Sequence, residues 1–216
     1  LRTSHAQSLP PMRFQPRDGE ILQTIYQNDG VLGRRHLKSM FWPNASEQAM
    51  EHRLSLLYRN SYLDWPNTEQ RRTKPIPEPI VWLGWKGALW LAGQGGIQVT
   101  PPTNDRENQM RLLATSLGKA GIRWVREPRW IQLAHDLAIV DIRMAVEKSV
   151  EAMPALMLEE WLPEGEFRSR VDVVEFTATG RDGKVIRGKK GVCPDSYFVV
   201  MNKGYLIEGQ PARARF

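Results

Sequence analysis

The sequence predicts an α+β protein in two parts, a helical N-terminal part and a C-terminal part whose helices precede a sheet. Helical spacing of apolar residues dominates the first two thirds of the chain, and short runs rich in Val, Ile, Phe and Tyr dominate the last third. A Gly/Pro-rich stretch at 93–105 interrupts the helical pattern. We therefore expect a flexible arm at 1–15, one domain at 16–95 and a second at 105–216.

Composition narrows the class of protein. The 216 residues are 41% hydrophobic, which is enough for one or two cores, and the net charge of +6 is compatible with a nucleic-acid partner. The single cysteine, Cys193, excludes an internal disulfide and a Cys-based zinc site, so a cytoplasmic location fits best. Because no apolar run approaches the ~18 residues of a membrane span, no membrane partner is expected. The chain begins at Leu1, which fits a fragment or a processed chain equally.

The N-terminal part begins with three short amphipathic helices, expected at 17–29, 33–41 and 45–61. Asn44 and Glu47, three residues apart, form a capping-box-like start for the third helix. These helices are separated by tight turns, and their apolar faces predict a common core.

A hairpin is expected next, formed by "YLDW" at 62–65 and "PIVWLG" at 79–84 around a Pro-rich loop with a basic tip. A short helix, "WKGALWLAG", follows. Three helices followed by a two-stranded wing is the order of a winged helix-turn-helix, in which the third helix enters the major groove and the wing reaches the DNA backbone.

The third helix has two distinct faces. If Met50, Leu54 and Leu57 face the core, a polar stripe lies opposite them and is free to hydrogen-bond to base edges or phosphates. Two alternatives stay open: these are solvated faces of an ordinary helical domain, or the wing tip is a protein-docking loop. The expected DNA-binding residues are Arg34, Arg35 and Lys38 on the second helix, Gln48, His52, Ser55 and Arg59 on the third, and Arg71, Arg72 and Lys74 in the wing.

The C-terminal part is expected to hold helices at 106–121 and 134–153, and then β-type runs separated by Gly and Asp-Gly turns. Its last stretch, "PDSYFVVMNKGYLIEG", contains two apolar runs joined by Asn202-Lys203-Gly204. We expect a hairpin that turns at these three residues and carries Asp195 and Glu208 at its ends.

The order of features resembles the replication-relaxation family of plasmid and mobile-element proteins, in which a winged helix precedes an α+β domain. The resemblance covers most of the chain. The segments that carry it are "RDGEILQTIYQNDGVLGRRHLKSMFW", "RLSLLYRNSYLDW", "VWLGWKGALWLAG", "HDLAIVDIRMAVE", "WLPEGEFRSR" and "PDSYFVVMNKGYLIEG".

The C-terminal pattern is also similar to the core of the PD-(D/E)xK nuclease-like fold, which presents an Asp and then Glu-x-Lys. This similarity implies that Asp195 and Glu208 hold a divalent cation such as Mg²⁺, with Glu164 as a further acid. Gln210 stands at the lysine position and cannot supply its positive charge. We therefore expect the nuclease-like shape in a degenerate form, without catalysis and without a bound cofactor.

Simpler interpretations of these residues stay open. Asp195 follows Pro194 and would start a strand from a turn, and Glu208 would be an exposed strand end. His135 beside Asp136 is typical of a helix cap, and histidines at 5, 36, 52 and 135 lack zinc-ligand spacing. A further basic run is typical of a solvated hairpin or extends a DNA path onto the second domain; it comprises Arg181, Lys184, Arg187, Lys189 and Lys190.

The function that these patterns favour is that of a DNA-binding accessory protein of plasmid or mobile-element replication, relaxation or conjugative transfer. Its expected partners are double-stranded DNA and replication or relaxase proteins. Two alternatives remain, a metal-dependent endonuclease targeted by the winged helix and a winged-helix transcriptional regulator. No heptad run identifies a dimer seam, so the oligomeric state is open.

Overall fold

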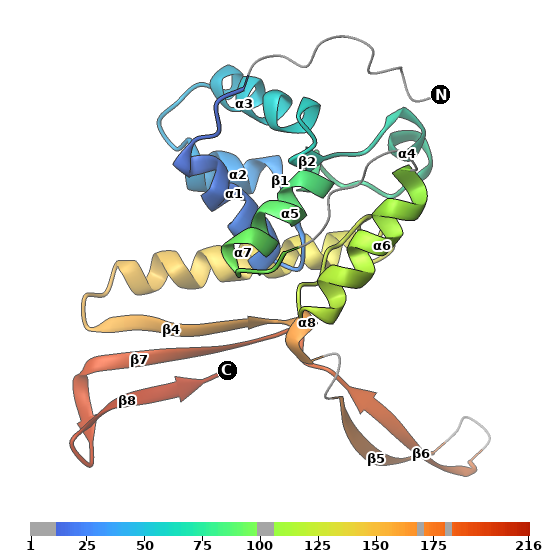
Figure 1. The fold of residues 1–216 in the computed structure, drawn as a ribbon. Coiled ribbons are helices and arrows are strands. Elements are labelled where there is room, and N and C mark those ends of the chain that lie inside the picture. Colours follow the sequence, from blue (N-terminus) through green and yellow to red (C-terminus); the bar gives the residue numbers. More distant parts are fainter. Residues whose placement is uncertain (1–11, 99–105, 168–170, 180–182) are drawn as a thin grey trace. The chain divides into compact units, whose positions relative to one another are not determined.

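The structure, a computed structural model, describes residues 12–98, 106–167, 171–179 and 183–216 and is of mixed α+β class (Figure 1). It contains two compact units, Leu1–Asp141 and Ile142–Phe216, which divide within helix α7 (Leu133–Glu151). The Gly/Pro-rich stretch, where the sequence placed the boundary, falls inside the first unit, and its residues 99–105 lie outside the described residues.

Residues 1–11 of the expected flexible arm also lie outside the described residues. The last residues of that arm are packed rather than loose. The Phe14 ring lies 5.1 Å from that of Tyr62 and 5.6 Å from that of Trp90, and Gln15 caps the first helix. Aromatic contact therefore fixes the chain from this point onward.

Three helices open the first unit as the sequence predicts: α1 (Pro16–Gln27), α2 (Arg34–Phe41) and α3 (Glu47–Arg59). The start of α3 differs from the expectation. Ser46, not Asn44, is its N-cap, because the Ser46 side chain accepts a hydrogen bond of 3.2 Å from the backbone N–H of Ala49.

A three-stranded antiparallel sheet completes the core of this unit, with β1 (Val31–Gly33), β3 (Ile80–Leu83) and β2 (Leu63–Asp64) in that spatial order. The hairpin of β2 and β3 was predicted, whereas β1 was not. A three-residue strand is too short to show a period of two in the sequence. Every residue of β1 and β3 is buried, so helices cover both faces of this sheet.

The connection between β2 and β3 is not the loop that the sequence predicts, because it contains the short helix α4 (Thr68–Thr73). Asn67 starts this helix with a capping box: its side-chain oxygen accepts from the Gln70 N–H at 2.8 Å, and the Gln70 side chain accepts from the Asn67 N–H at 2.9 Å. The basic tip therefore has a defined shape.

Helices α5 (Trp85–Gln94) and α6 (Arg106–Lys119) pack together through Ala88 and Ala92 on one side and Leu113 and Leu117 on the other. Helix α5 also approaches the backbone beside β2, where a Cβ at position 87 would clash with the carbonyl oxygen of Tyr62. Gly87 permits this approach because it has no side chain.

The first half of α7 packs against the sheet, where Leu133 and Leu137 join a buried cluster with Val31, Ile80 and Trp82. This cluster explains why the first unit continues to Asp141. The apolar face of α7 predicted its burial, but not which strands would receive it.

The second unit contains an antiparallel sheet of β4 (Leu156–Pro163), β7 (Ser196–Ile207) and β8 (Gln210–Arg215), in the order β4-β7-β8. Trp161, Phe198 and Phe216, one from each strand or its end, stack at 5.0 Å along the sheet. The one-turn helix α8 (Glu164–Phe167) replaces part of a predicted strand. A separate two-stranded hairpin joins β5 (Asp172–Thr179) to β6 (Val185–Val192).

The hairpin turn expected at Asn202-Lys203-Gly204 is wrong, because β7 continues through these residues. They form an irregularity in which the Gly204 N–H donates to the Asn202 side chain at 2.9 Å. The turn lies instead at Glu208-Gly209, where φ is +51° and +77° and Ile207 pairs with Gln210. Two successive positive φ angles suit a two-residue antiparallel hairpin.

Candidate nucleic-acid interface

The outer face of α3 carries the polar stripe that the sequence predicts. Met50 is 4% exposed, and Leu54 and Leu57 are fully buried, so the opposite side of the helix points away from the core. Gln48, His52 and Arg59 are exposed, and Ser55 is half-buried. The stripe therefore presents four side chains that are able to hydrogen-bond to a ligand.

The basic residues of the β2–β3 connection, where the sequence predicts a wing, are exposed as well. Arg71, Arg72 and Lys74 lie on α4 or directly after it, and all three are exposed. The Arg71 Nε donates to the Pro66 carbonyl oxygen at 3.0 Å, which fixes the side chain while leaving further guanidinium donors. The β2–β3 connection thus combines a fixed arginine with two further cations.

The cations of α2 have partners within the protein. The Arg34 Nη1 donates to both carboxylate oxygens of Glu51 at 2.7 Å, and its guanidinium lies 5.1 Å from the Trp65 ring. The Lys38 Nζ donates to the carbonyl oxygen of Trp42 at 2.6 Å, at the C-terminal end of the helix. A DNA contact by either residue stays a prediction, and it would compete with these interactions.

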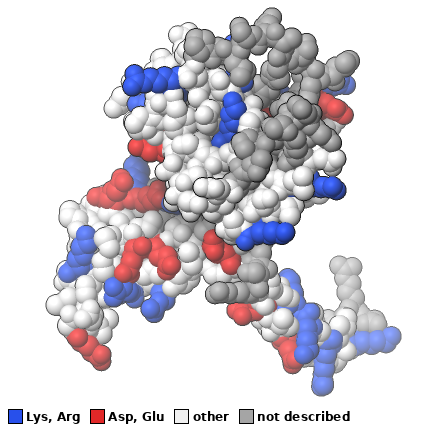
Figure 2. All heavy atoms as spheres, viewed as in Figure 1, with Lys and Arg blue, Asp and Glu red and all other residues white. Residues whose placement is uncertain are grey.

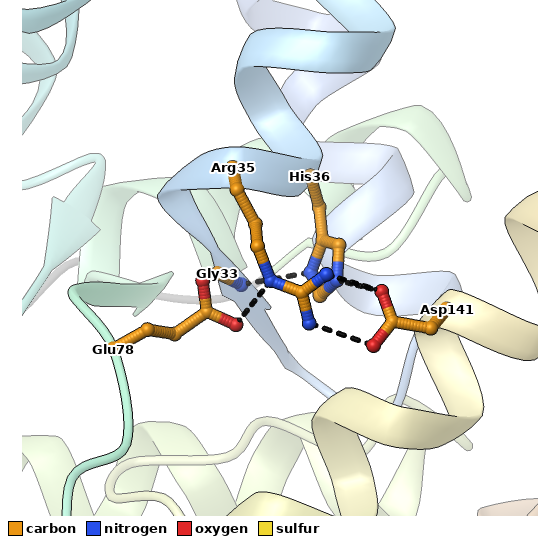
Figure 3. Close-up of polar contacts among 5 residues, drawn as sticks. All are labelled: Gly33, Arg35, His36, Glu78 and Asp141. Carbon is orange, nitrogen blue, oxygen red and sulfur yellow. Dashed lines mark hydrogen bonds and ion pairs between the residues drawn. The ribbon is translucent and has the colours of Figure 1, made fainter.

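Arg35 is bound most extensively of the three (Figure 3). Its Nη1 and Nη2 donate to the two carboxylate oxygens of Asp141 at 2.5 and 2.6 Å, and its Nε donates to Glu78 at 2.8 Å. These hydrogen bonds, those to Asp141 first and then that to Glu78, raise the pKa of Arg35. The hydrogen bond from Arg35 in turn holds the pKa of Asp141 below its ordinary value.

His36 completes this cluster from inside the fold, with 1% of its surface exposed. Its Nδ1 accepts from the Gly33 N–H at 3.1 Å, and its Nε2 lies 3.0 Å from the Asp141 carboxylate. Because Nδ1 accepts a hydrogen bond from a backbone N–H, the neutral ring carries its proton on Nε2, and this N–H donates a hydrogen bond to Asp141. His36 therefore caps α2 and anchors α7 at the same time.

A second group of side chains fixes α3 relative to the start of the β2–β3 connection. The rings of Tyr58, on α3, and Trp65, after β2, stack with centroids 3.9 Å apart, and Arg34 of α2 lies over the Trp65 ring. The Arg34–Glu51 pair closes the connection back to α3. The Trp65 ring thus links α2, α3 and the start of the β2–β3 connection.

A buried ion pair holds α3 against α1. Asp18 is fully buried, and its carboxylate accepts hydrogen bonds from Arg53 Nε at 2.8 Å, from Arg53 Nη2, and from the Gln15 N–H at 2.7 Å. Arg53 also donates to the Arg13 carbonyl oxygen at 2.8 Å. The hydrogen bond to Asp18 raises the pKa of Arg53. The pair fixes the orientation from which the exposed stripe of α3 projects.

Sequence reasoning missed the residues that position the interface, namely Asp18, His36, Arg53 and Asp141. Two of them have a local signal, because Asp18 and His36 stand at the third position of their helices, where a side chain reaches back to the N-cap N–H. Nothing local pairs residue 18 with 53 or residue 35 with 141.

The acids expected to bind a metal do not come together. Asp195 directly precedes β7 and Glu208 directly follows it, so the twelve-residue strand separates them by on the order of 30–40 Å. Gln210 begins β8 beside Glu208. Glu164 follows Pro163, which pairs with Ser196, so the register brings Glu164 and Asp195 to the same end of the sheet.

Metal ligands lie within about 2.6 Å of their ion, so Asp195 and Glu208 cannot share one cation in this arrangement. Within the residues that the structure describes, no group of three or more His, Cys, Asp or Glu side chains is arranged to hold a metal. Over the same residues, no helix has the length and apolar character needed to cross a membrane.

Comparison with known proteins assigns neither a family nor a function to the chain. No family model matches the chain, and no curated protein and no solved structure matches it either.

Proposed function

We propose that this protein binds double-stranded DNA through the exposed stripe of α3 and the basic residues of the wing. The observation that carries the proposal is a division among the cations of the first unit. Those of α2 have partners within the protein, whereas Arg59 on α3 and Arg72 and Lys74 at α4 are exposed. Exposed Arg and Lys side chains suit phosphate contacts, and a polar helix face suits base-edge contacts in a major groove.

The order of elements supports a winged-helix interpretation. Helices α1, α2 and α3 precede the β2–β3 hairpin, β1 pairs with β3, and α3 presents its polar face outward. In this interpretation α3 is the recognition helix and α4 is the tip of the wing. The resemblance to the replication-relaxation family extends the proposal to plasmid or mobile-element replication, relaxation or transfer in the cytoplasm, with relaxase or replication proteins as partners.

The positions of the candidate acids weaken the alternative of a metal-dependent endonuclease. Its two principal acids, Asp195 and Glu208, lie at opposite ends of β7, and Gln210 cannot replace the missing lysine. A winged-helix regulator would use the same DNA interface, and mapping of the bound sites distinguishes it from an accessory replication protein.

The test is a DNA-binding titration with a triple variant, Arg59→Ala, Arg71→Ala and Arg72→Ala. If each residue contacts DNA, the three losses together lower the affinity for duplex DNA roughly 100-fold or more and reduce its salt dependence. Fluorescence anisotropy of a labelled duplex, at two salt concentrations and with and without Mg²⁺, measures the affinity and its salt dependence. A gel of the same samples reveals nicking.

The matched control removes three exposed cations from other helices: Arg111→Ala, Lys119→Ala and Lys148→Ala. This variant has the same net charge as the test variant, so it separates local contact from overall electrostatic attraction. The proposal predicts a much smaller loss in the control. Equal losses in the two variants, or no loss in the test variant, would contradict it.

A further inference from the structure

The β5–β6 hairpin is the most exposed secondary structure among the described residues. Its strands pair in antiparallel register from Asp172 with Val192 to Thr179 with Val185. Every β5 residue is exposed, and all of β6 is exposed except Gly188, which is half-buried. An isolated two-stranded hairpin is at best marginally stable in water, so a ligand that covers one face would stabilise it.

The two faces of this ribbon differ in character, because side chains alternate along a strand. One face, which we call the polar face, carries the pairs Glu175 with Lys189 and Thr177 with Arg187 at its centre, with Val173 and Val185 toward its two ends. On the other face, Phe176 lies opposite Gly188, where an added Cβ would come within 2.8 Å of the ring. That face also carries Val174, Ala178, Ile186, Lys190 and Val192.

The charge of the ribbon indicates its ligand. Its described residues include the cations Lys184, Arg187, Lys189 and Lys190 against the acids Asp172 and Glu175, and Figure 2 shows blue side chains gathered over this hairpin. Lys189 and Glu175 form an ion pair of 2.7 Å, but both side chains are at least 70% exposed. Such an exposed ion pair contributes little to stability, so a phosphate would readily displace the Glu175 carboxylate from Lys189.

We propose that the β5–β6 ribbon is a second DNA-binding element, with its polar face, including Arg187, Lys189 and Thr177, against the duplex. This inference rests on the proposed function of binding double-stranded DNA. The major groove of B-form DNA admits a two-stranded ribbon, and Arg, Lys and Thr side chains are common phosphate contacts. The net positive charge favours nucleic acid over a protein partner on this face.

The test compares two cations of β6 that project from opposite faces. Arg187→Gln removes a charge from the polar face, and Lys190→Gln removes one from the face of Phe176; both side chains are exposed. Titration of the full chain with a labelled duplex should show an affinity about three- to tenfold lower for Arg187→Gln, with the salt slope reduced by about 1. Lys190→Gln should differ little from the unaltered chain.

Equal effects of the two substitutions, or no effect of either, would overturn the ribbon proposal. Unchanged DNA affinity in Arg187→Gln together with self-association that Phe176→Ser abolishes would assign the ribbon to protein contact instead. Thermal unfolding of each variant checks that the fold is intact.

The variant Arg59→Ala, Arg71→Ala, Arg72→Ala distinguishes this inference from the proposed function. If it binds DNA normally while Arg187→Gln binds weakly, the α3 interface is wrong and the ribbon is supported. If only the triple variant is impaired, the ribbon proposal fails and the α3 interface is supported. No DNA binding by the unaltered chain would overturn both.

Discussion

The arginines of the first unit fall into two sets that look alike in the sequence and differ in the fold. Arg34, Arg35 and Arg53 bind carboxylates of other elements, whereas Arg59 and Arg72 are exposed. The first set supports the orientation of α2 and α3, and the second is exposed on α3 and α4. A basic helix is therefore evidence for nucleic-acid binding only if its cations are not already paired with carboxylates of the same protein.

The strongest test of the comparison removes the buried carboxylate that binds Arg53. Asp18→Ala leaves Arg53 without its carboxylate in a largely buried position, so we expect a loss of about 3–5 kcal/mol in the free energy of unfolding. Urea denaturation monitored by circular dichroism measures it. A loss below about 1 kcal/mol would mean that α1 and α3 do not depend on this pair.

The histidines of α2 and α3 are expected to have different roles, one in stabilising the fold and the other in contacting DNA. His36→Ala removes a buried ring with two hydrogen-bond partners, and should cost about 1–3 kcal/mol of stability. His52→Ala, on the exposed stripe, should change stability by less than about 0.5 kcal/mol and weaken DNA binding instead. Parallel unfolding and binding titrations check both. A larger loss of stability in His52→Ala than in His36→Ala would contradict this assignment of roles.

The start of α3 gives a smaller effect with an adjacent control. Ser46→Ala removes the N-cap hydrogen bond to Ala49 and should cost about 1 kcal/mol of stability. Asn44→Ala, two residues earlier, should be close to neutral because Asn44 does not cap the helix. Thermal unfolding of the two variants distinguishes them, and the reverse order would restore the capping box that the sequence suggested.

The smallest expected effect depends on pH. Arg35 lowers the pKa of Asp141 in the folded state, so the stabilisation from this pair is complete above the ordinary carboxyl pKa of about 3.9 and is lost as pH falls through the lowered value. Because the Asp141 side chain is 43% exposed, we expect less than about 1 kcal/mol.

Urea unfolding of the unaltered chain and of Asp141→Asn, from pH 7 to pH 2, measures the contribution of this carboxylate. The difference in stability between the two should shrink at the acidic end. A difference that stays constant across this range would show that the charge of Asp141 contributes nothing.

Much of the fold followed from local pattern. The helical period located α1, α2, α3 and α7, and Met50, Leu54 and Leu57 are buried as predicted. The apolar-aromatic runs located the β2–β3 hairpin. The failures are local choices between similar signals: Asn44 against Ser46 for a cap, and Asn202-Lys203-Gly204 against Glu208-Gly209 for a turn. In each case both candidate positions contain residues suited to a cap or a turn, so the local sequence does not distinguish them.

The sequence by itself determined the helices, the basic β2–β3 connection and the two faces of α3, because these depend on residue spacing along a short stretch of chain. Only the tertiary structure decided which charges remain available. Arg35 meets Asp141 across 106 positions of sequence, Arg53 meets Asp18 across 35, and Asp195 and Glu208 separate along a continuous strand. An ion pair or a metal site depends on distances of a few ångströms between elements, and these distances exist only once the elements have packed.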